Sequence, residues 1–384
     1  MSMEKSRAII NGRIITPEGA LTGSAVIFDE KILAVVPEKN IKHFGVEERI
    51  DAEGCFVSPG FIDMHTHGAV GHDTMDGDIE GIRAISEKYA SLGVTGFLAT
   101  TMTMEIDSIK KALDSIRKAM QYNYGAKVLG CHLEGPFISG KYPGAQNASY
   151  IKAADFSLIE DYRDVIKLVT IAPEAEGSDE FIRHCVNEGV SISIGHSSAT
   201  YEEAANAFKL GARSVTHTFN AMPALHHREP GIIGAAMDDK EVYCELIADN
   251  IHVHPVMQRV LLKTKGVDRI ILITDSMRAA GMPEGCYDLG GQTVYVKNDS
   301  ARLENGTLAG SILTMDKALG NFMSNAGISI DDAVRLATIN PSSLLGLGER
   351  LGRLQEGLDA DITVFNEQFD VLFTYVNGGL CYKR

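Results

Sequence analysis

Apolar runs of strand length alternate with helical stretches through the middle of the chain. The helical stretches, such as 78–91, 105–120 and 200–210, are amphipathic, whereas the runs between them are almost continuously apolar. Strands buried on both faces of a parallel sheet have this unbroken apolar pattern. Eight such runs occur, at 56–62, 95–100, 128–133, 166–172, 191–195, 214–217, 243–248 and 269–274.

Eight successive strand–helix units favour an α/β fold of the closed (β/α)8 TIM-barrel type. An open, doubly wound sheet is the alternative, but no Gly-x-Gly-x-x-Gly turn follows the first strand. We therefore expect a barrel domain over residues 56–348. Residues 286–312 depart from the alternation and indicate a β-hairpin inserted after the eighth strand, with turns at Gly290-Gly291 and Asn305-Gly306.

Short strand-like segments without intervening helical patterns occupy both ends of the chain. They include 8–10, 13–15, 25–28 and 32–36 near the start, and 361–365 and 372–376 near the end. Strands at both ends with nothing helical between them suggest one small domain built from the two termini. We expect residues 1–55 and 349–384 to form a small β-sandwich domain.

Composition narrows the class of protein. The 384 residues are 45% hydrophobic and 23% charged, which is ordinary for a globular protein. The formal charge of −15 argues against a nucleic-acid or anionic membrane partner. Six scattered cysteines, no apolar run of membrane-spanning length and no signal-peptide pattern lead us to expect a cytoplasmic protein. Because the net charge is −15, an anionic substrate would need a locally cationic site.

Polar residues stand where most of the predicted strands end. His65 and His67 are two residues apart, so their side chains point the same way from an extended strand. Each of these residues alone has a structural explanation, such as a hydrogen-bonded histidine or an N-cap aspartate. Packing alone does not explain so many at one end of five strands, the end where barrel enzymes hold their active sites. The residues at these five strand ends are His65, His67, Glu134, His196, His217 and Asp275, and His252 follows the seventh strand.

These ligand types predict a divalent metal site. Imidazole and carboxylate without thiolate suit zinc first, with iron or manganese as alternatives. Asp275 is placed to act as general base and then general acid, because the first and last strands of a closed barrel are neighbours. His252 would donate a hydrogen bond to a carbonyl oxygen as it becomes an oxyanion. Such a constellation hydrolyses amides or related C–N bonds.

The residues in question stand in motifs that resemble the amidohydrolase superfamily and, within it, the N-acetylglucosamine-6-phosphate deacetylases. The general motifs are Pro59 to Gly68, Ala337 to Pro341 and Gly352 to Asp361. The more specific ones are His132 to Phe137, Gly195 to Ser197, Thr216 to Met222, Ala248 to His252, Thr274 to Met277 and Gly306 to Ser311. They span nearly the whole chain in the right order.

The resemblance implies removal of an acetyl group from the 2-amino position of a 6-phosphosugar. It implies that Glu134, His196 and His217 bind a constant metal, and that His65 and His67 add a second ion, so that each subunit holds one or two. Asp275 corresponds to the catalytic acid/base and His252 to a substrate contact.

The resemblance also assigns substrate binding. Phosphate recognition falls to Asn220, the Ala221 amide, His227 and Arg228, and Arg228 would serve the neighbouring subunit of a homodimer. Two further contacts come from the loops that contain Ala145 and Leu308. Gln146 departs from the family pattern, because some relatives have a histidine near the sugar at this position.

Other functions are compatible with parts of this pattern. Amidohydrolases with a carbamylated lysine need a lysine at the end of strand four, where this chain has Ile171-Ala172-Pro173-Glu174. Purine deaminases lack the phosphate loop. A catalytically inactive, assembly-forming relative would usually have lost ligands, and the full set is present here.

Overall fold

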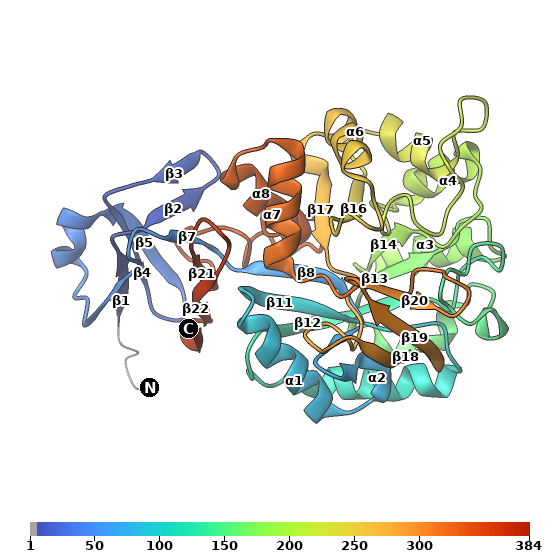
Figure 1. Cartoon of the computed structure of the whole chain (residues 1–384), viewed down its shortest axis with the longest axis horizontal. Helices are drawn as coiled ribbons and strands as arrows, with labels where there is room; N and C mark the ends of the chain where they lie inside the picture. The colour runs from blue at the N-terminus through green and yellow to red at the C-terminus, as the bar shows by residue number, and fades with distance from the viewer. Residues whose placement is uncertain (1–5) are drawn as a thin grey trace.

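The computed structural model describes residues 6–384. An eight-stranded parallel sheet forms the larger part (Figure 1). Each strand pairs with the next along the chain, which confirms the predicted α/β barrel fold. In order around the sheet the strands are β8 (Phe61–Thr66), β11 (Val94–Thr100), β12 (Lys127–Glu134), β13 (Ile166–Ile171), β14 (Ser191–Ile194), β15 (Ser214–Val215), β16 (Tyr243–Ile247) and β17 (Ile270–Ile273).

The seam between β8 and β17 is closed by a side chain as well as by backbone. Asp63 accepts hydrogen bonds from the Thr274 backbone N–H at 3.3 Å and from the Thr274 hydroxyl at 2.6 Å. Just beyond it, the Asp275 N–H donates to the His65 carbonyl at 2.9 Å. The first and last strands therefore meet at the residues that carry candidate site chemistry.

Helices pack around the outside of the barrel, with their apolar faces turned to the strands. Asp78 caps the first of them, accepting from the N–H groups of Glu80 and Gly81, and Thr200 and Glu203 form a reciprocal capping box on α4. The predicted helices near 78–91, 105–120 and 200–210 are confirmed. The nine α-helices described are α1 (Ile79–Ala90), α2 (Ile106–Ala119), α3 (Ser178–Asn187), α4 (Tyr201–Leu210), α5 (Gly231–Asp238), α6 (Pro255–Lys265), α7 (Met315–Ala326), α8 (Ile330–Leu336) and α9 (Ile339–Leu344).

Two sheets made from both ends of the chain pack beside the barrel (Figure 1). The first has the order β5-β4-β1-β6 and the second β23-β22-β21-β7-β2-β3. Their core is aliphatic and aromatic, with Val26, Phe28, Val57 and Ile362 all fully buried. The strands are β1 (Arg7–Ile10), β2 (Arg13–Thr16), β3 (Gly19–Leu21), β4 (Ser24–Phe28), β5 (Ile32–Pro37), β6 (Glu48–Asp51), β7 (Phe56–Pro59), β21 (Ile362–Phe365), β22 (Val371–Val376) and β23 (Gly379–Lys383).

The run 56–62, predicted as a single barrel strand, is divided between these two parts. Its first half, β7, pairs with β2 and β21 in the six-stranded sheet, whereas β8 begins at Phe61 in the barrel. Gly60 stands between them. Only glycine fits at this position, because a Cβ would lie 2.1 Å from the Thr95 side chain. We therefore propose that the domain boundary lies at Gly60 rather than before residue 56.

The insert after β17 is a three-stranded antiparallel sheet, not a single hairpin. It contains β18 (Gly285–Leu289), β19 (Gln292–Lys297) and β20 (Ser300–Leu303). The predicted turn at Gly290-Gly291 joins β18 to β19. Asn298 and Asp299, both with positive φ, form the second turn, which is not among the predicted ones.

An ion-pair cluster joins the barrel to the small β domain. Lys127, at the start of β12, lies 3.1 Å from Asp359 and 2.8 Å from Asp361, and donates to the Asn377 side chain at 2.9 Å. Both carboxylates are buried, and Lys31 and Arg350 also pair with Asp359.

Within residues 6–384, no helix has the length and apolarity to cross a membrane.

Candidate active site and metal centre

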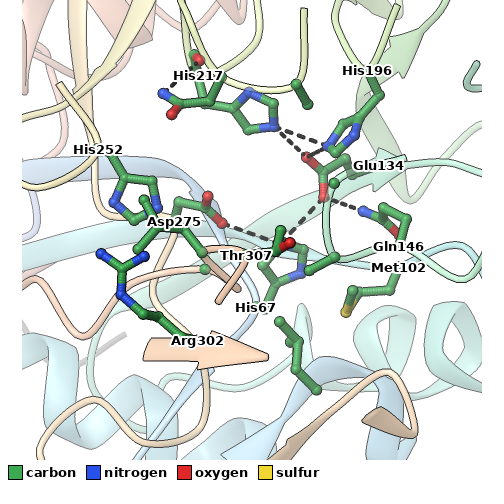
Figure 2. Close-up of a pocket in the computed structure, with 17 residues that line it drawn as sticks. His67, Met102, Glu134, Gln146, His196, His217, His252, Asp275, Arg302 and Thr307 are labelled. Atoms are coloured by element: carbon green, nitrogen blue, oxygen red, sulfur yellow. Dashed lines mark hydrogen bonds and ion pairs between the residues drawn. The ribbon is translucent and has the colours of Figure 1, made fainter. Parts of the chain in front are cut away.

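The polar residues predicted from the strand ends meet at the carboxyl-terminal end of the barrel. His65 and His67 come from the end of β8, Glu134 from the end of β12, and Asp275 from just after β17. His196 and His217 follow β14 and β15. Figure 2 shows His196, His217 and Gln146 turned toward Glu134, with Asp275 beside His67. These side chains are at most 10% exposed.

Local backbone geometry turns three of these residues inward. His196, His217 and Asp275 have φ angles of 47°, 28° and 48°, in the left-handed region that L-residues seldom adopt. Each stands directly after a barrel strand, so the change of direction aims the side chain across the barrel opening instead of along the strand. Such backbone is characteristic of functional sites.

Glu134 is the centre of the cluster. Its Oε1 atom lies 3.1 Å from Nε2 of both His196 and His217, and 3.3 Å from Nε2 of His65. Its Oε2 atom lies 3.3 Å from Nε2 of His67 and accepts a 2.7 Å hydrogen bond from the Gln146 amide. One carboxylate therefore faces four imidazoles, two groups of ligands sharing it.

The carboxylates and imidazoles of the cluster shift one another's pKa values. Burial alone would raise the pKa of Glu134, but the neighbouring His65 and His196 hold it well below its usual range. Burial opposes protonation of His67, yet Asp275 and Glu134 outweigh it and raise the His67 pKa to about 10. Glu134 and Asp275 raise the pKa of His65 in the same way, against the effect of burial. The carboxylates thus draw cations to this point.

Further side chains orient the ligands from behind. The Gln146 carbonyl oxygen accepts from the Thr103 N–H at 2.6 Å, which fixes the amide so that its NH₂ group faces Glu134. His196 Nδ1 lies 3.1 Å from the Tyr142 carbonyl, a contact that leaves Nε2 facing Glu134. His65 Nδ1 lies 3.0 Å from the Glu245 carboxylate.

His252 lies on the rim of the site, in the loop after β16. Its Nδ1 atom lies 2.6 Å from the Asp249 carboxylate, whose pKa is lowered, despite burial, by the hydrogen bond with His252. Asp249 also accepts from the backbone N–H groups of Ile251 and His252, which fixes the loop. Because Asp249 takes Nδ1, the Nε2 side of the ring faces the cavity (Figure 2).

A cavity of about 350 Å³ opens above the cluster. Its lining includes the predicted contacts Asn220, Ala221, Ala145 and Leu308, together with His252 and Asp275. His227 and Arg228 do not line it. They lie exposed on the loop before α5, with the Arg228 guanidinium 2.8 Å from the His227 ring.

Three residues of the site were not predicted. Glu245 lies in the middle of an apolar strand, where a lone acidic residue between Cys244 and Leu246 was the available signal. Arg302 reaches the cavity from β20 and is, among the described residues, the one Lys or Arg side chain in its lining. Gln146 was noted as a departure, but its contact with Glu134 depends on a loop whose path the sequence does not reveal.

Comparison with known proteins identifies the family. The model of the amidohydrolase family matches residues 56–381. The chain belongs to the amidohydrolase family.

Relatives that match nearly the whole chain are deacetylases of 6-phosphosugars, which confirms the resemblance seen in the sequence motifs. N-acetylglucosamine-6-phosphate deacetylase of Bacillus subtilis strain 168 is 38% identical over 99% of this chain and 98% of its own length. N-acetylgalactosamine-6-phosphate deacetylase of Escherichia coli O157:H7 is 35% identical, covering 96% and 97%. The crystal structure of N-acetylglucosamine-6-phosphate deacetylase from Pasteurella multocida superposes with a TM-score of 0.92 at 32% identity, covering 98% and 99%.

Amidohydrolases depend on a divalent metal, and the ligand atoms of this amidohydrolase fit one. Two groups, His65–His67–Glu134 and Glu134–His196–His217, each place three ligand atoms within 4.8 Å of one another. Nε2 of His196 and Nε2 of His217 are 3.0 Å apart and both face Glu134. In tetrahedral zinc sites with bonds of about 2.0–2.1 Å, neighbouring ligand atoms are about 3.3 Å apart. The spacing of the three atoms is thus close to that of a metal's ligands.

The structure also separates this amidohydrolase from the lysine-dependent type. Strand β13 ends at Ile171, and the following Glu174 accepts hydrogen bonds from Ser197 and Ser198 rather than reaching the cluster. Glu134 supplies the carboxylate that the two ligand groups share.

Proposed function

We propose that this protein hydrolyses N-acetyl-D-glucosamine 6-phosphate to D-glucosamine 6-phosphate and acetate, in amino-sugar catabolism and cell-wall amino-sugar recycling. The observation that carries the proposal is Asp275 beside a complete His/Glu ligand cluster, at the base of a cavity in a chain whose full-length relatives are 6-phosphosugar deacetylases.

The proposal assigns the metal to the His/Glu cluster. Glu134, His196 and His217 would hold the constant ion, with His65 and His67 holding a second. Zinc is our first expectation, since imidazole and carboxylate ligands suit it, with iron or manganese as alternatives. When bound, such an ion polarises the amide carbonyl and acidifies a water molecule.

Asp275 moves the protons in this proposal. Its Oδ1 atom lies 3.3 Å from His67 Nε2 and 3.6 Å from His65 Nε2, and the two imidazoles lower its pKa against the effect of burial. It is therefore ionised at neutral pH and able to accept the proton of the attacking water. The same carboxyl group then delivers that proton to the departing amine nitrogen.

His252 stabilises the developing negative charge. With Nδ1 oriented by Asp249, its Nε2 side can donate to the carbonyl oxygen of the acetyl group. Asn220 and the Ala221 N–H would bind the phosphate, because amide donors satisfy anionic oxygens. Ala145 and Leu308, which also line the cavity, would contact the sugar.

Acetate release from a panel of substrates tests the reaction. We expect kcat/KM for N-acetylglucosamine 6-phosphate to exceed that for N-acetylglucosamine by about 100-fold, the effect of one or two charge-assisted hydrogen bonds to phosphate. Equal rates for the two sugars would refute the phosphate assignment. N-acetylgalactosamine 6-phosphate is the second candidate, because a relative covering nearly this whole chain acts on it.

We also propose a cytoplasmic homodimer in which His227 and Arg228 serve the neighbouring active site. Support comes from their exposure outside the cavity of their own chain and from the suitability of guanidinium for phosphate. Mixing Asp275→Asn and Arg228→Ala subunits tests this assignment. Each mixed dimer would hold one intact site, so activity should return to about a quarter of wild type. If Arg228 acts within its own subunit, no activity returns.

A further inference from the structure

Glu245 is a buried carboxylate that the proposed reaction does not use. It lies on β16 with no exposed surface, among otherwise apolar strand neighbours. It does not line the cavity and so does not reach a substrate. Burying a carboxylate is costly unless strong interactions offset the cost, so the partners of Glu245 indicate its role.

Both contacts of Glu245 go to metal-ligand residues. Its Oε2 atom lies 3.0 Å from Nδ1 of His65 and accepts a 3.1 Å hydrogen bond from the backbone N–H of His217. Its Oε1 atom has no hydrogen-bond partner in the described part of the chain. One oxygen thus connects a member of each ligand group.

The contact with His65 determines which nitrogen of that ring is free. When His65 binds a metal its ring is neutral, with one N–H and one lone pair, and a carboxylate beside Nδ1 keeps the proton there. The lone pair of Nε2 then points into the cluster, where Glu134 Oε1 is 3.3 Å away and Asp275 Oδ1 is 3.6 Å away. Nε2 makes no hydrogen bond itself, so it is presented as a free ligand atom.

The contact with His217 acts on the backbone. His217 has a φ of 28°, and its N–H is held by Glu245 rather than by a neighbouring strand. This bond stabilises the left-handed turn that directs the His217 ring toward Glu134 and His196. Loss of the carboxylate would therefore disturb one ligand through its proton and another through its backbone.

We propose that Glu245 is a positioning residue that holds His65 in the Nδ1–H form and couples the two ligand groups. The inference deepens the proposed function, since it rests on the assignment of His65 and His217 as metal ligands. Partners of this kind, behind a metal-binding histidine, typically change metal affinity 10- to 100-fold.

Cobalt titration of the metal-free protein tests the proposal without any substrate, so its outcome is independent of the deacetylase assignment. The His65-dependent site is defined as the binding lost or weakened in His65→Gln. In Glu245→Gln, we expect the Kd of that site to rise about 10- to 100-fold, with a changed cobalt absorption spectrum. Glu241→Gln, which alters an exposed carboxylate just before the same strand, should bind cobalt as the wild type does.

Three results would overturn the proposal. Unchanged cobalt affinity in folded Glu245→Gln would make the residue merely structural, even if the variant unfolded at a lower temperature. Cobalt binding that does not respond to His65→Gln would show that His65 is no ligand. Equal weakening by the Glu241→Gln control would show a general charge effect.

A measurement on the unmodified chain covers the case in which Glu245→Gln fails to fold. In zinc-loaded protein with ¹⁵N-labelled histidine, the His65 ring, identified by its loss in His65→Gln, should carry its proton on Nδ1 in slow exchange with water. A proton on Nε2, or fast exchange at Nδ1, would refute the proposal.

Discussion

Two clusters of buried carboxylates in this protein differ in how their negative charge is balanced. At the domain boundary, the Lys127 ammonium lies between the carboxylates of Asp359 and Asp361 and donates a hydrogen bond to the Asn377 side chain. At the end of the barrel, Glu134, Asp275 and Glu245 surround His65 and His67, and no Lys or Arg side chain pairs with them in the described residues.

The difference lies in where the positive charge comes from. The boundary cluster contains its own cation and holds two domains together. The barrel cluster turns the Nε2 atoms of four imidazoles toward the Glu134 carboxylate, and His65 Nε2 has no hydrogen-bond partner in the described residues. Buried polar atoms are normally paired, so the barrel cluster is suited to receive a cation from outside the chain, whereas both boundary carboxylates already lie within 3.1 Å of the Lys127 ammonium.

Removing Asp275, the proposed proton carrier of the barrel cluster, should have the largest effect. We expect Asp275→Asn to lower kcat by about 10³- to 10⁴-fold, because the amide cannot accept the water proton. Metal content, measured by atomic emission, should remain at the wild-type value. Loss of metal together with activity would make Asp275 chiefly a ligand.

The corresponding change at the boundary cluster should affect stability and leave the chemistry alone. Lys127→Met leaves the buried Asp361 carboxylate without its cation, whereas Asp359 keeps Lys31 and Arg350. The uncompensated charge should lower the free energy of unfolding by about 3–5 kcal/mol. Urea unfolding measures this loss, and kcat of the folded fraction should be unchanged. Lys167→Met, on the next strand, is the control, because this half-buried lysine donates to the Asp164 backbone carbonyl and not to a buried carboxylate. A Lys127→Met variant as stable as wild type would show that the cluster contributes no net stability.

Gln146 offers a smaller test within the barrel cluster. Gln146→Met keeps the length of the side chain but removes the donor to Glu134 and the acceptor for the Thr103 N–H. We expect a loss of about 2–3 kcal/mol in transition-state stabilisation, or about 30- to 150-fold in kcat/KM, the usual effect of a hydrogen bond to a charged group. Gln368→Met, on an exposed turn, should have no effect. Full activity in Gln146→Met would show that Glu134 keeps its orientation without the amide.

The smallest expected effect is a pH dependence at the boundary. Burial would raise the Asp359 pKa, but Lys31 and Lys127 lower it to about 2. Because the folded-state pKa is depressed, this stabilisation is present above pH 4 and is lost as pH falls toward 2. Asp361 does not add to the loss, since burial raises its pKa. Asp359→Asn should thus be less stable than wild type by about 1–2 kcal/mol at pH 6, with exposed Lys31 allowing some solvent screening, and the difference should shrink toward pH 2.5.

The elements that were predictable from sequence are those with a local signal. Continuous apolar runs identify the barrel strands, and a histidine or carboxylate directly after such a run projects at the end where all the strands finish. The division of 56–62 was missed because β7 and β8 form one apolar stretch, and only the close approach of Thr95 to Gly60 shows where it bends.

Residues that act through distant partners were not predictable in this way. Glu245 contacts His65 across 180 positions of the chain, and Lys127 contacts Asp359 across 232. Neither pair has a spacing or motif that marks it. Gln146 was visible as an unusual residue, but its role depends on Thr103 from another loop.

The pairing of β7 with β21 has a consequence for synthesis of the chain. Strand β7 leads through Gly60 directly into the first barrel strand, but its antiparallel partner is Ile362–Phe365, about 300 positions later. A nascent chain on the ribosome thus contains every proposed metal ligand before the sheet that anchors the first strand can be completed. Contacts of such long range form slowly. Until β21 is made, β7 can pair only on the side of β2, and its other edge is exposed to pairing with other chains.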